Sequence, residues 1–180
     1  MTGICIGAAI KGMKPILSHQ RVEFSLLSIE QIINQAAKWN FMSGGKQKVP
    51  LVIRLIIGKG WGQGPQHSKS LYQMFAHLPG LKVAVPSNPY DAKGMIINSI
   101  FGNAPTIILE NRSLFSMKGM VDKKMYRINE APKQLCYGKK LTIVSFGNEL
   151  QIVKRALKKL KLKDVDLIDL RYLKPLNVSK

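Results

Sequence analysis

Glycine and histidine residues near the middle of the chain have the types and spacing that could do chemistry. Four glycines alternate with other residues at positions 58, 60, 62 and 64, and His67 follows where a helical pattern begins. A glycine-rich turn after a strand can hold a ligand at the carboxyl edge of a parallel sheet, and an imidazole there can transfer protons near neutral pH. Taken alone, the loop fits a ligand loop and a tight connection equally well.

The spacing of these glycines excludes two common nucleotide-binding motifs. The possible positions of the third glycine in a dinucleotide fingerprint hold Gln63, Pro65 and His67, and no acid follows about 20 residues later to bind a ribose. No Gly-Lys-Ser/Thr sequence follows, which excludes a P-loop. Of the other histidines, His77 lies near a helix end and favours a structural role, whereas His19 fits either the core or a site. No metal-ligand pair stands at helical spacing, so we expect no metal site.

Strand and helix patterns alternate around these residues. The expected strands are 16–22, 49–57, 81–85 and 106–109. The expected helices are 3–12, 25–41, 68–78 and 91–101. This alternation predicts an α/β fold in which a parallel sheet carries helices on both faces.

The alternation stops between residues 110 and 140, where polar residues dominate and we expect an extended connector. We expect a first domain over residues 1–120, a linker over 121–140 and the start of a second α/β domain over 141–180. The second domain would hold one βαβ unit, made of a strand at 141–145, a helix at 149–160 and a strand at 165–170. One such unit cannot bury both faces of its strands, so the second domain should be incomplete or completed by something else.

The chain is strongly basic. Twenty-eight Lys and Arg against ten Asp and Glu give a formal net charge of +18. Such a surface can attract nucleic acid, anionic lipid or an acidic protein, but it can also be an ordinary solvated surface. The densest basic run, residues 154–163, has its apolar residues at helical spacing and predicts an amphipathic helix. No nucleic-acid-binding motif accompanies the charge, so we expect no specific nucleic-acid partner.

Cysteine usage and apolar runs bear on the cellular compartment. Cys5 and Cys136 have no CxxC spacing, which indicates neither a disulfide framework nor a zinc site. No apolar run approaches the ~20 residues of a membrane span. Lys11 and Lys14 follow the first apolar segment, whereas a secretory signal has its positive charge before that segment. We expect a soluble, cytoplasmic protein with no membrane partner.

Several long segments resemble one enzyme family. They read NQAAKWNFMSGG (34–45), GPQHSKS (64–70) and HLPGLKVAVPSNPYDAKG (77–94), and the opening GICIGAAIKGMKPI and the late LIDLRYLKPLN are similar to the same family. The family is the beta subunit of the thiamine-diphosphate-dependent decarboxylase component of 2-oxoacid dehydrogenase complexes, as in pyruvate dehydrogenase. The resemblance covers nearly the whole chain. It implies a transketolase-like pyrimidine-binding domain followed by a carboxyl-terminal transketolase-type domain.

The resemblance also implies partners and a shared cofactor. In that family an alpha subunit binds the diphosphate of thiamine diphosphate through magnesium, using a GDG motif, and two alpha and two beta subunits form a heterotetramer. This chain has no GDG sequence. The magnesium site is therefore expected on the alpha subunit, with no metal bound by this chain alone.

The same resemblance implies roles for four residues. His67 matches the family's active-site histidine, which transfers protons or stabilises charge. Phe24 matches the aromatic residue that packs against the aminopyrimidine ring, and Gln20 matches a position that lines the same pocket. Glu23 stands where some relatives have Asp. Without the resemblance, Phe24 is a core aromatic at a helix start and Glu23 is a capping acid.

The chain departs from the family pattern at three places. The RGPxG motif is replaced by RLIIG at residues 54–58, which could reshape the mouth of the site and the choice of substrate. A carboxylate that helps to bind potassium in some members corresponds to Gly102, so we expect no strong potassium site. The glutamate that activates the cofactor would precede residues 3–12, yet the first carboxylate of this chain is Glu23. We therefore expect a beta subunit that is truncated at both ends.

The predicted function is that of such a beta subunit. The full enzyme would decarboxylate a 2-oxoacid and pass the acyl group to a lipoyl carrier on an acyltransferase, whereas the isolated chain should be inactive. Two alternatives stay open. A non-catalytic or degenerate interface module is favoured by the missing glutamate and disfavoured by the GPQHS segment. A basic nucleic-acid-binding protein is supported by charge alone.

Overall fold

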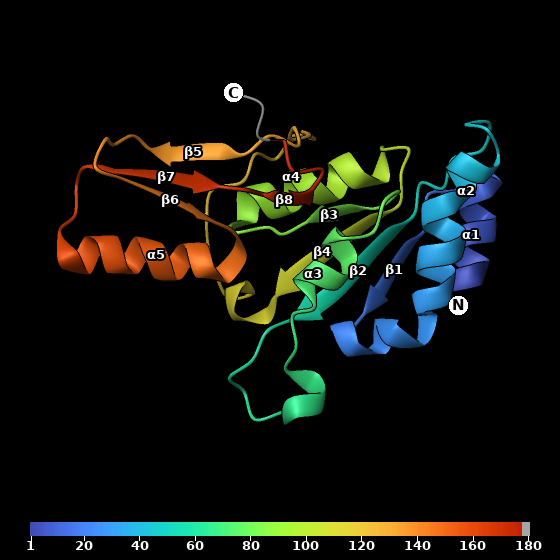
Figure 1. Cartoon of the computed structure of the whole chain (residues 1–180), viewed down its shortest axis with the longest axis horizontal. Helices are drawn as coiled ribbons and strands as arrows, with labels where there is room; N and C mark the ends of the chain where they lie inside the picture. Colours follow the sequence, from blue (N-terminus) through green and yellow to red (C-terminus); the bar gives the residue numbers. More distant parts are fainter. Residues whose placement is uncertain (178–180) are drawn as a thin grey trace.

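A twisted sheet of five strands forms the centre of the molecule (Figure 1). The computed structural model describes residues 1–177. The sheet has the order β1-β2-β4-β3-β8. Its first four strands are mutually parallel: β1 (Ile16–His19), β2 (Val52–Ile57), β4 (Thr106–Asn111) and β3 (Lys82–Ala84). The predicted α/β fold with a parallel sheet is confirmed.

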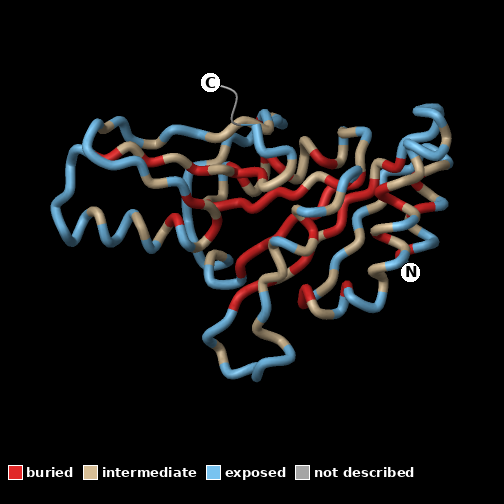
Figure 2. The backbone as a smooth tube through the Cα atoms, in the orientation of Figure 1, coloured by how far each residue is buried: buried red, intermediate tan, exposed pale blue. Residues whose placement is uncertain are grey.

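Helices pack on both faces of this sheet, as the mainly apolar strands β2 and β4 require. Alternate residues of β2 belong to different cores. Ile53, Leu55 and Ile57 pack with α1 (Thr2–Ile10), η2 (Gln31–Ala36), α2 (Ala37–Met42) and α3 (Tyr72–Ala76). Val52 packs with Met95 of α4 (Pro89–Ile100) on the other face. Figure 2 shows buried residues running along the central strands.

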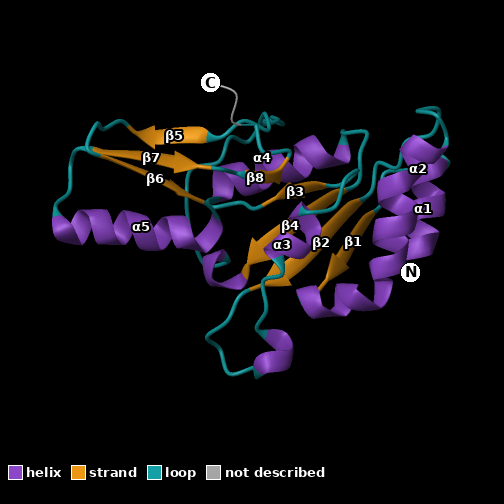
Figure 3. Ribbon diagram, viewed as in Figure 1, coloured by secondary structure: helices purple, strands orange, loops and turns teal. Residues whose placement is uncertain are grey.

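A second, smaller sheet adjoins the first. Its order is β5-β7-β6, with β5 (Lys133–Cys136), β7 (Val165–Asp169) and β6 (Leu141–Ser145). The strands β6 and β7 are parallel and are joined by α5 (Gly147–Leu160), as predicted. Figure 3 shows α5 lying along one side of this sheet. The last three residues of the second predicted domain, 178–180, lie outside the described part of the chain.

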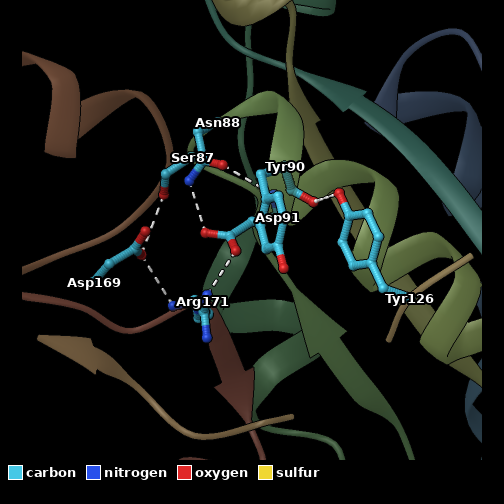
Figure 4. Close-up of polar contacts among 7 residues, drawn as sticks. All are labelled: Ser87, Asn88, Tyr90, Asp91, Tyr126, Asp169 and Arg171. Carbon is cyan, nitrogen blue, oxygen red and sulfur yellow. Dashed lines mark hydrogen bonds and ion pairs between the residues drawn. The ribbon is translucent and has the colours of Figure 1, made fainter. Parts of the chain in front are cut away.

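The extended connector expected between residues 110 and 140 is only partly correct, because it contains strand β5. This strand pairs antiparallel with β7 and supplies partners for backbone groups at an otherwise open edge. Its four residues are mostly exposed and show no apolar alternation, so the sequence carries no signal for it. Part of the remaining connector is held by Tyr126, whose ring stacks on Tyr90 at 4.4 Å and whose hydroxyl donates to Tyr90 O (Figure 4).

A further strand, β8 (Tyr172–Lys174), was not expected from the sequence. It pairs antiparallel with β3 and completes the larger sheet at its edge. Tyr172 is 1% exposed and packs with Met95 and Ile108. The burial of this single aromatic ring explains why the chain returns from the smaller sheet to the larger one.

The predicted helix over residues 25–41 is wrong in its details. A 3₁₀ helix, η1 (Val22–Ser28), comes first, followed by the π-helical η2 and the short α2. Ser25 Oγ donates to Val22 O at 2.6 Å. This i to i−3 bond competes with α-helical bonding at the start of the segment. Within residues 1–177, no helix combines the length and the apolar character that crossing a bilayer requires.

Buried polar groups join the two sheets (Figure 4). Arg171, between β7 and β8, forms an ion pair with Asp91 of α4, with 2.7 Å between Nη2 and Oδ1. Ser87 Oγ donates to Asp169 Oδ1 at 3.2 Å, and the Arg171 N–H donates to the same oxygen at 3.1 Å. Asn88 caps α4 by accepting the Asp91 N–H at 2.9 Å. These contacts fix the carboxyl-terminal strands against the start of α4.

Candidate functional site

The candidate residues meet because three neighbouring parallel strands end at one edge of the sheet. In the register of β1, β2 and β4, His19 pairs with Leu55, and Ile57 pairs with Asn111. The segment 20–24, the glycine loop and Arg112 therefore leave the sheet at the same carboxyl edge, where open α/β sheets bind ligands. In Figure 1 the glycine loop and η3 (Pro65–His67) project beyond this edge.

Phe24 and His67 lie side by side, although they are 43 positions apart in the sequence. Their ring centroids are 5.4 Å apart and the rings are tilted by 53°. Phe24 comes from η1 and is 43% exposed, so part of its ring is accessible to a ligand. His67 ends η3 and is half-buried. The structure thus brings these two predicted residues together, and their role in a shared site stays a prediction.

Glu23 ties the two segments together. Its Oε1 accepts the backbone N–H of Lys69 at 2.8 Å, which fixes the chain just after His67. Among the described residues, 1–177, the other carboxylate oxygen, Oε2, is buried and has no hydrogen-bond partner, and neither has His67 Nδ1. A buried polar atom without a partner is costly, so these two atoms on contacting segments make this place a candidate site for a ligand with polar groups.

The glycine loop has the conformation that only glycine adopts readily. Gly58, Gly60, Gly62 and Gly64 all have positive φ, between +67° and +115°. At Gly58 a Cβ would lie 2.9 Å from both Asn111 Oδ1 and Trp61 Cη2. Gly58 therefore lets the Trp61 ring close over the end of β4, and the alternating glycines are required by local geometry.

Gln20 and His19, which also lie at this edge, differ in exposure. Gln20 is exposed and follows β1 directly. His19, at the end of β1, is half-buried, and its Nε2 is buried without a partner. Burial lowers the pKa of the His19 imidazole. The sequence alone did not distinguish a core position from a site position for His19. Its place as the last residue of a parallel strand is the signal that favours the site edge.

The other face of the sheet carries a cavity of about 330 Å³, lined by Arg54, Glu110 and apolar residues that include Phe115 and Met117. It contains none of the candidate site residues. The Arg54 guanidinium and the Glu110 carboxylate satisfy each other through two bonds of 2.6 and 2.7 Å. Because the two charged groups of this cavity are paired with each other, we place the chemistry beside Phe24 and His67 instead. Within residues 1–177, no cluster of three or more His, Cys, Asp or Glu could hold a metal ion.

Comparison with known proteins identifies the family of this chain. The profile of the family described as transketolase, pyrimidine binding domain, matches residues 1–118. This chain belongs to that family. The pyrimidine-binding domain therefore includes β1 to β4, the glycine loop and the ring pair of Phe24 and His67.

Named relatives extend the similarity over nearly the whole chain. The beta subunit of acetoin:2,6-dichlorophenolindophenol oxidoreductase of Cupriavidus necator is 38% identical over 180 residues, covering 98% of this chain and 53% of the relative. The beta subunit of the pyruvate dehydrogenase E1 component of Rhizobium meliloti is 36% identical, covering 98% of this chain and 39% of the relative. The chain thus spans about half, or less, of the length of these relatives.

A solved structure supports the fold of this pyrimidine-binding domain protein independently. The structure, described as a split gene transketolase, inactive beta4 tetramer, superposes with a TM-score of 0.78. The superposition covers 97% of this chain and 55% of the transketolase chain, at 20% sequence identity. At this identity the likeness establishes the transketolase-like fold alone.

Proposed function

We propose that this chain is the pyrimidine-binding part of the beta subunit of a thiamine-diphosphate-dependent 2-oxoacid dehydrogenase. The observation that carries the proposal is the contact of the exposed Phe24 ring with His67, beside two buried polar atoms without partners. A family whose description names pyrimidine binding and relatives named for pyruvate and acetoin oxidation support the same conclusion.

The residues at the site fit an aminopyrimidine ring. Phe24 offers an apolar ring face, while Glu23 Oε2 and His67 Nδ1 need hydrogen-bond partners that a ring with amino and nitrogen groups can supply. Exposed Gln20 can line the rim of the same pocket. When bound, thiamine diphosphate supplies a cationic thiazolium ring that stabilises the negative charge left by decarboxylation.

His67 would be the proton-transfer residue of this site. Its ring is positioned on one side by Phe24, and its backbone is held by the bond from His67 N to Gly64 O. Glu23 accepts the Lys69 N–H two residues later, which restrains the backbone after His67. Such positioning is what general acid–base catalysis requires, because a proton donor must lie within hydrogen-bond reach of the reacting atom.

The wider assembly belongs to the same proposal. An alpha subunit would hold the diphosphate and magnesium, two beta subunits would meet in a heterotetramer, and a lipoyl acyltransferase would receive the acyl group. Since this sequence has no GDG motif for the diphosphate, the isolated chain should not decarboxylate 2-oxoacids, even with cofactor and magnesium added. We further propose a first domain over residues 1–120, a linker over 121–140 and the start of a second domain at 141–180. The parallel pair of β6 and β7 supports the second domain, whereas β5 lies within the linker and β8 pairs with β3 of the larger sheet.

The test is turnover of the assembled complex, with a beta subunit that carries the upstream glutamate and a whole second domain, with the alpha subunit, cofactor and magnesium present, and with an artificial electron acceptor as readout. His67→Ala should lower 2-oxoacid turnover by about 10²-fold or more, as loss of a proton-transfer group does. The matched control is His77→Ala, since His77 is exposed and ends the short helix α3. Equal activity of the His67 and His77 variants would contradict the proposal, as would activity of the purified chain alone that His67→Ala abolishes.

A further inference from the structure

Two arginines contact the same tryptophan ring on the glycine loop. The guanidinium carbon of Arg21 lies 4.9 Å from the centroid of the Trp61 ring, and that of Arg112 lies 5.3 Å from it. Arg21 follows β1, Trp61 follows β2 and Arg112 follows β4, so neighbouring strands bring all three to one edge. None of them was singled out as a site residue from the sequence.

These two positive charges have no carboxylate partner. Within residues 1–177, neither Arg21 nor Arg112 takes part in an ion pair of 4.0 Å or less. Burial, followed by the charge of Arg112, lowers the pKa of Arg21, and the charge of Glu23 partly offsets both effects. Within residues 1–177, Glu23 forms no ion pair with Arg21, and its Oε1 accepts the Lys69 N–H. In contrast, Arg54 on the other sheet face is fully paired with Glu110.

Arg21 also carries an unused donor that points to a ligand. The residue is only 6% exposed, and its Nη1 is buried without a hydrogen-bond partner among residues 1–177. Its Nη2 donates to Gln63 Oε1, which also accepts the Trp61 Nε1–H at 3.0 Å. The side chain is therefore held in place while one edge of the guanidinium stays free. A guanidinium kept in this way is suited to a carboxylate or phosphate oxygen.

The glycine loop is open around three of its glycines. A Cβ at Gly60, Gly62 or Gly64 would meet no atom within 4 Å. Arg112 is exposed, whereas Arg21 is buried. We expect an entering anion to meet the exposed Arg112 before the buried Arg21.

We propose that Arg21 and Arg112 form an oxyanion subsite on the glycine loop, which binds the carboxylate of an anionic 2-oxoacid and disfavours neutral substrates such as acetoin. The assignment of this anion as the substrate rests on the proposed function, whereas the existence of the subsite does not. Gln63 links Arg21 to the segment that ends in His67. The subsite thereby lies on the same loop as the proton-transfer residue.

Trp61 reports on binding to this subsite. The chain has two tryptophans, Trp39 and Trp61. In a Trp39→Phe variant, the tryptophan fluorescence therefore arises from Trp61 alone. The 180-residue chain is titrated at constant ionic strength with pyruvate, inorganic phosphate or acetoin, without cofactor or alpha subunit. We expect a saturable change with pyruvate and none with acetoin. Because no catalysis is involved, the result is independent of whether the proposed enzyme function holds.

Variants assign the signal to the two arginines. Loss of one charge-assisted hydrogen bond should weaken pyruvate binding roughly tenfold or more in Arg21→Gln and in Arg112→Gln. Arg21→Lys keeps the charge and should bind more tightly than Arg21→Gln. The matched control is Arg127→Gln, because exposed Arg127 lies 4.8 Å from the Phe101 ring and away from the loop.

Each result decides the proposal. If Arg21→Gln does not fold, as judged by circular dichroism, Arg112→Gln decides alone because its side chain is exposed. Equal pyruvate binding by Arg112→Gln and Arg127→Gln would overturn the subsite. Saturation by acetoin, or phosphate binding tighter than pyruvate binding, would overturn its assignment to a 2-oxoacid carboxylate.

Discussion

Arg171 and Asp91 form an ion pair inside the protein, with 2.7 Å between Arg171 Nη2 and Asp91 Oδ1 and side-chain exposures of 9% and 1%. The pair joins the segment between β7 and β8 to the first turn of α4, which are 80 positions apart in the sequence. Asp91 Oδ2 accepts a further bond of 2.7 Å from Asn88 Nδ2 (Figure 4). One carboxylate thus fixes both the start of α4 and the path of the carboxyl-terminal strands.

Breaking this ion pair from either side should strongly destabilise the fold. Arg171→Gln leaves Asp91 as a buried charge without its cation, and Asp91→Asn leaves Arg171 without its anion. Each change should lower the free energy of unfolding by about 3–5 kcal/mol. In a double-mutant cycle by urea denaturation, the double variant should be less destabilised than the sum of the single variants. Strict additivity would show that the pair contributes no mutual interaction.

Asp169 should make the stability depend on pH. Burial is the main cause that raises the pKa of Asp169 above its ordinary value of 3.8, although the Arg171 N–H and the Ser87 hydroxyl act in the opposite direction. A carboxyl whose pKa is raised by folding stabilises the fold below its unfolded pKa, and this contribution is lost as pH rises through the folded pKa. Asp169→Asn removes the titration and keeps an oxygen for both hydrogen bonds.

The difference in unfolding free energy, Asp169→Asn minus wild type, should therefore grow as pH rises from about 4 and level off above the folded pKa. Chemical denaturation at a series of pH values measures it. The exposed Asp122→Asn variant serves as the control and should show no such growth. A difference that shrinks with rising pH would mean that the hydrogen bonds, rather than burial, dominate the pKa of Asp169.

Gly80 should tolerate no side chain. Its φ is +91°, and a Cβ would lie 1.9 Å from Ala37 O at the start of α2. Gly80→Ala should lower the free energy of unfolding by about 2–5 kcal/mol, from left-handed backbone strain and overpacking together. Gly45→Ala is the control, because Gly45 has φ of +79° but open space around a Cβ, and should show the strain alone, about 1–2 kcal/mol. Thermal denaturation that ranks the two variants equally would contradict the steric argument.

Phe24 should matter for ligand binding more than for folding. Because its ring is 43% exposed, Phe24→Ala should change thermal stability little, yet it should weaken thiamine diphosphate binding by the assembled complex about tenfold. Phe41→Ala, at an 86% exposed ring in α2, is the control and should leave the affinity unchanged. The reverse pattern, with lost stability and intact affinity, would make Phe24 a structural residue.

The net charge of +18 should produce only non-specific attraction to DNA. Binding by counterion release falls steeply with salt and does not depend on sequence. A salt titration with two unrelated duplexes of equal length measures both properties. Tight binding to one duplex at physiological salt would instead favour a nucleic-acid-binding function.

Much of the fold could be predicted from local sequence patterns. The strands β2 and β4 are marked by their own apolar residues, and the glycine loop is marked by its own glycines. The α/β alternation and the loop could therefore be predicted from residues close together in the sequence. In contrast, β5 and β8 form by pairing with the edges of strands that are distant in the sequence, β7 and β3 respectively. The 3₁₀ and π-helical turns after β1 depend on competing bonds such as that of Ser25, which helical periodicity does not reveal.

The same division applies to the site. The sequence by itself determined the candidates His67 and Phe24, through the position of one beside a glycine-rich turn and the resemblance of both to a known family. Only the tertiary structure decided that their rings lie 5.4 Å apart and that Arg21 and Arg112 share the Trp61 ring. Strand order β1-β2-β4 sets these contacts, and strand order results from packing of the whole sheet, which no local segment encodes.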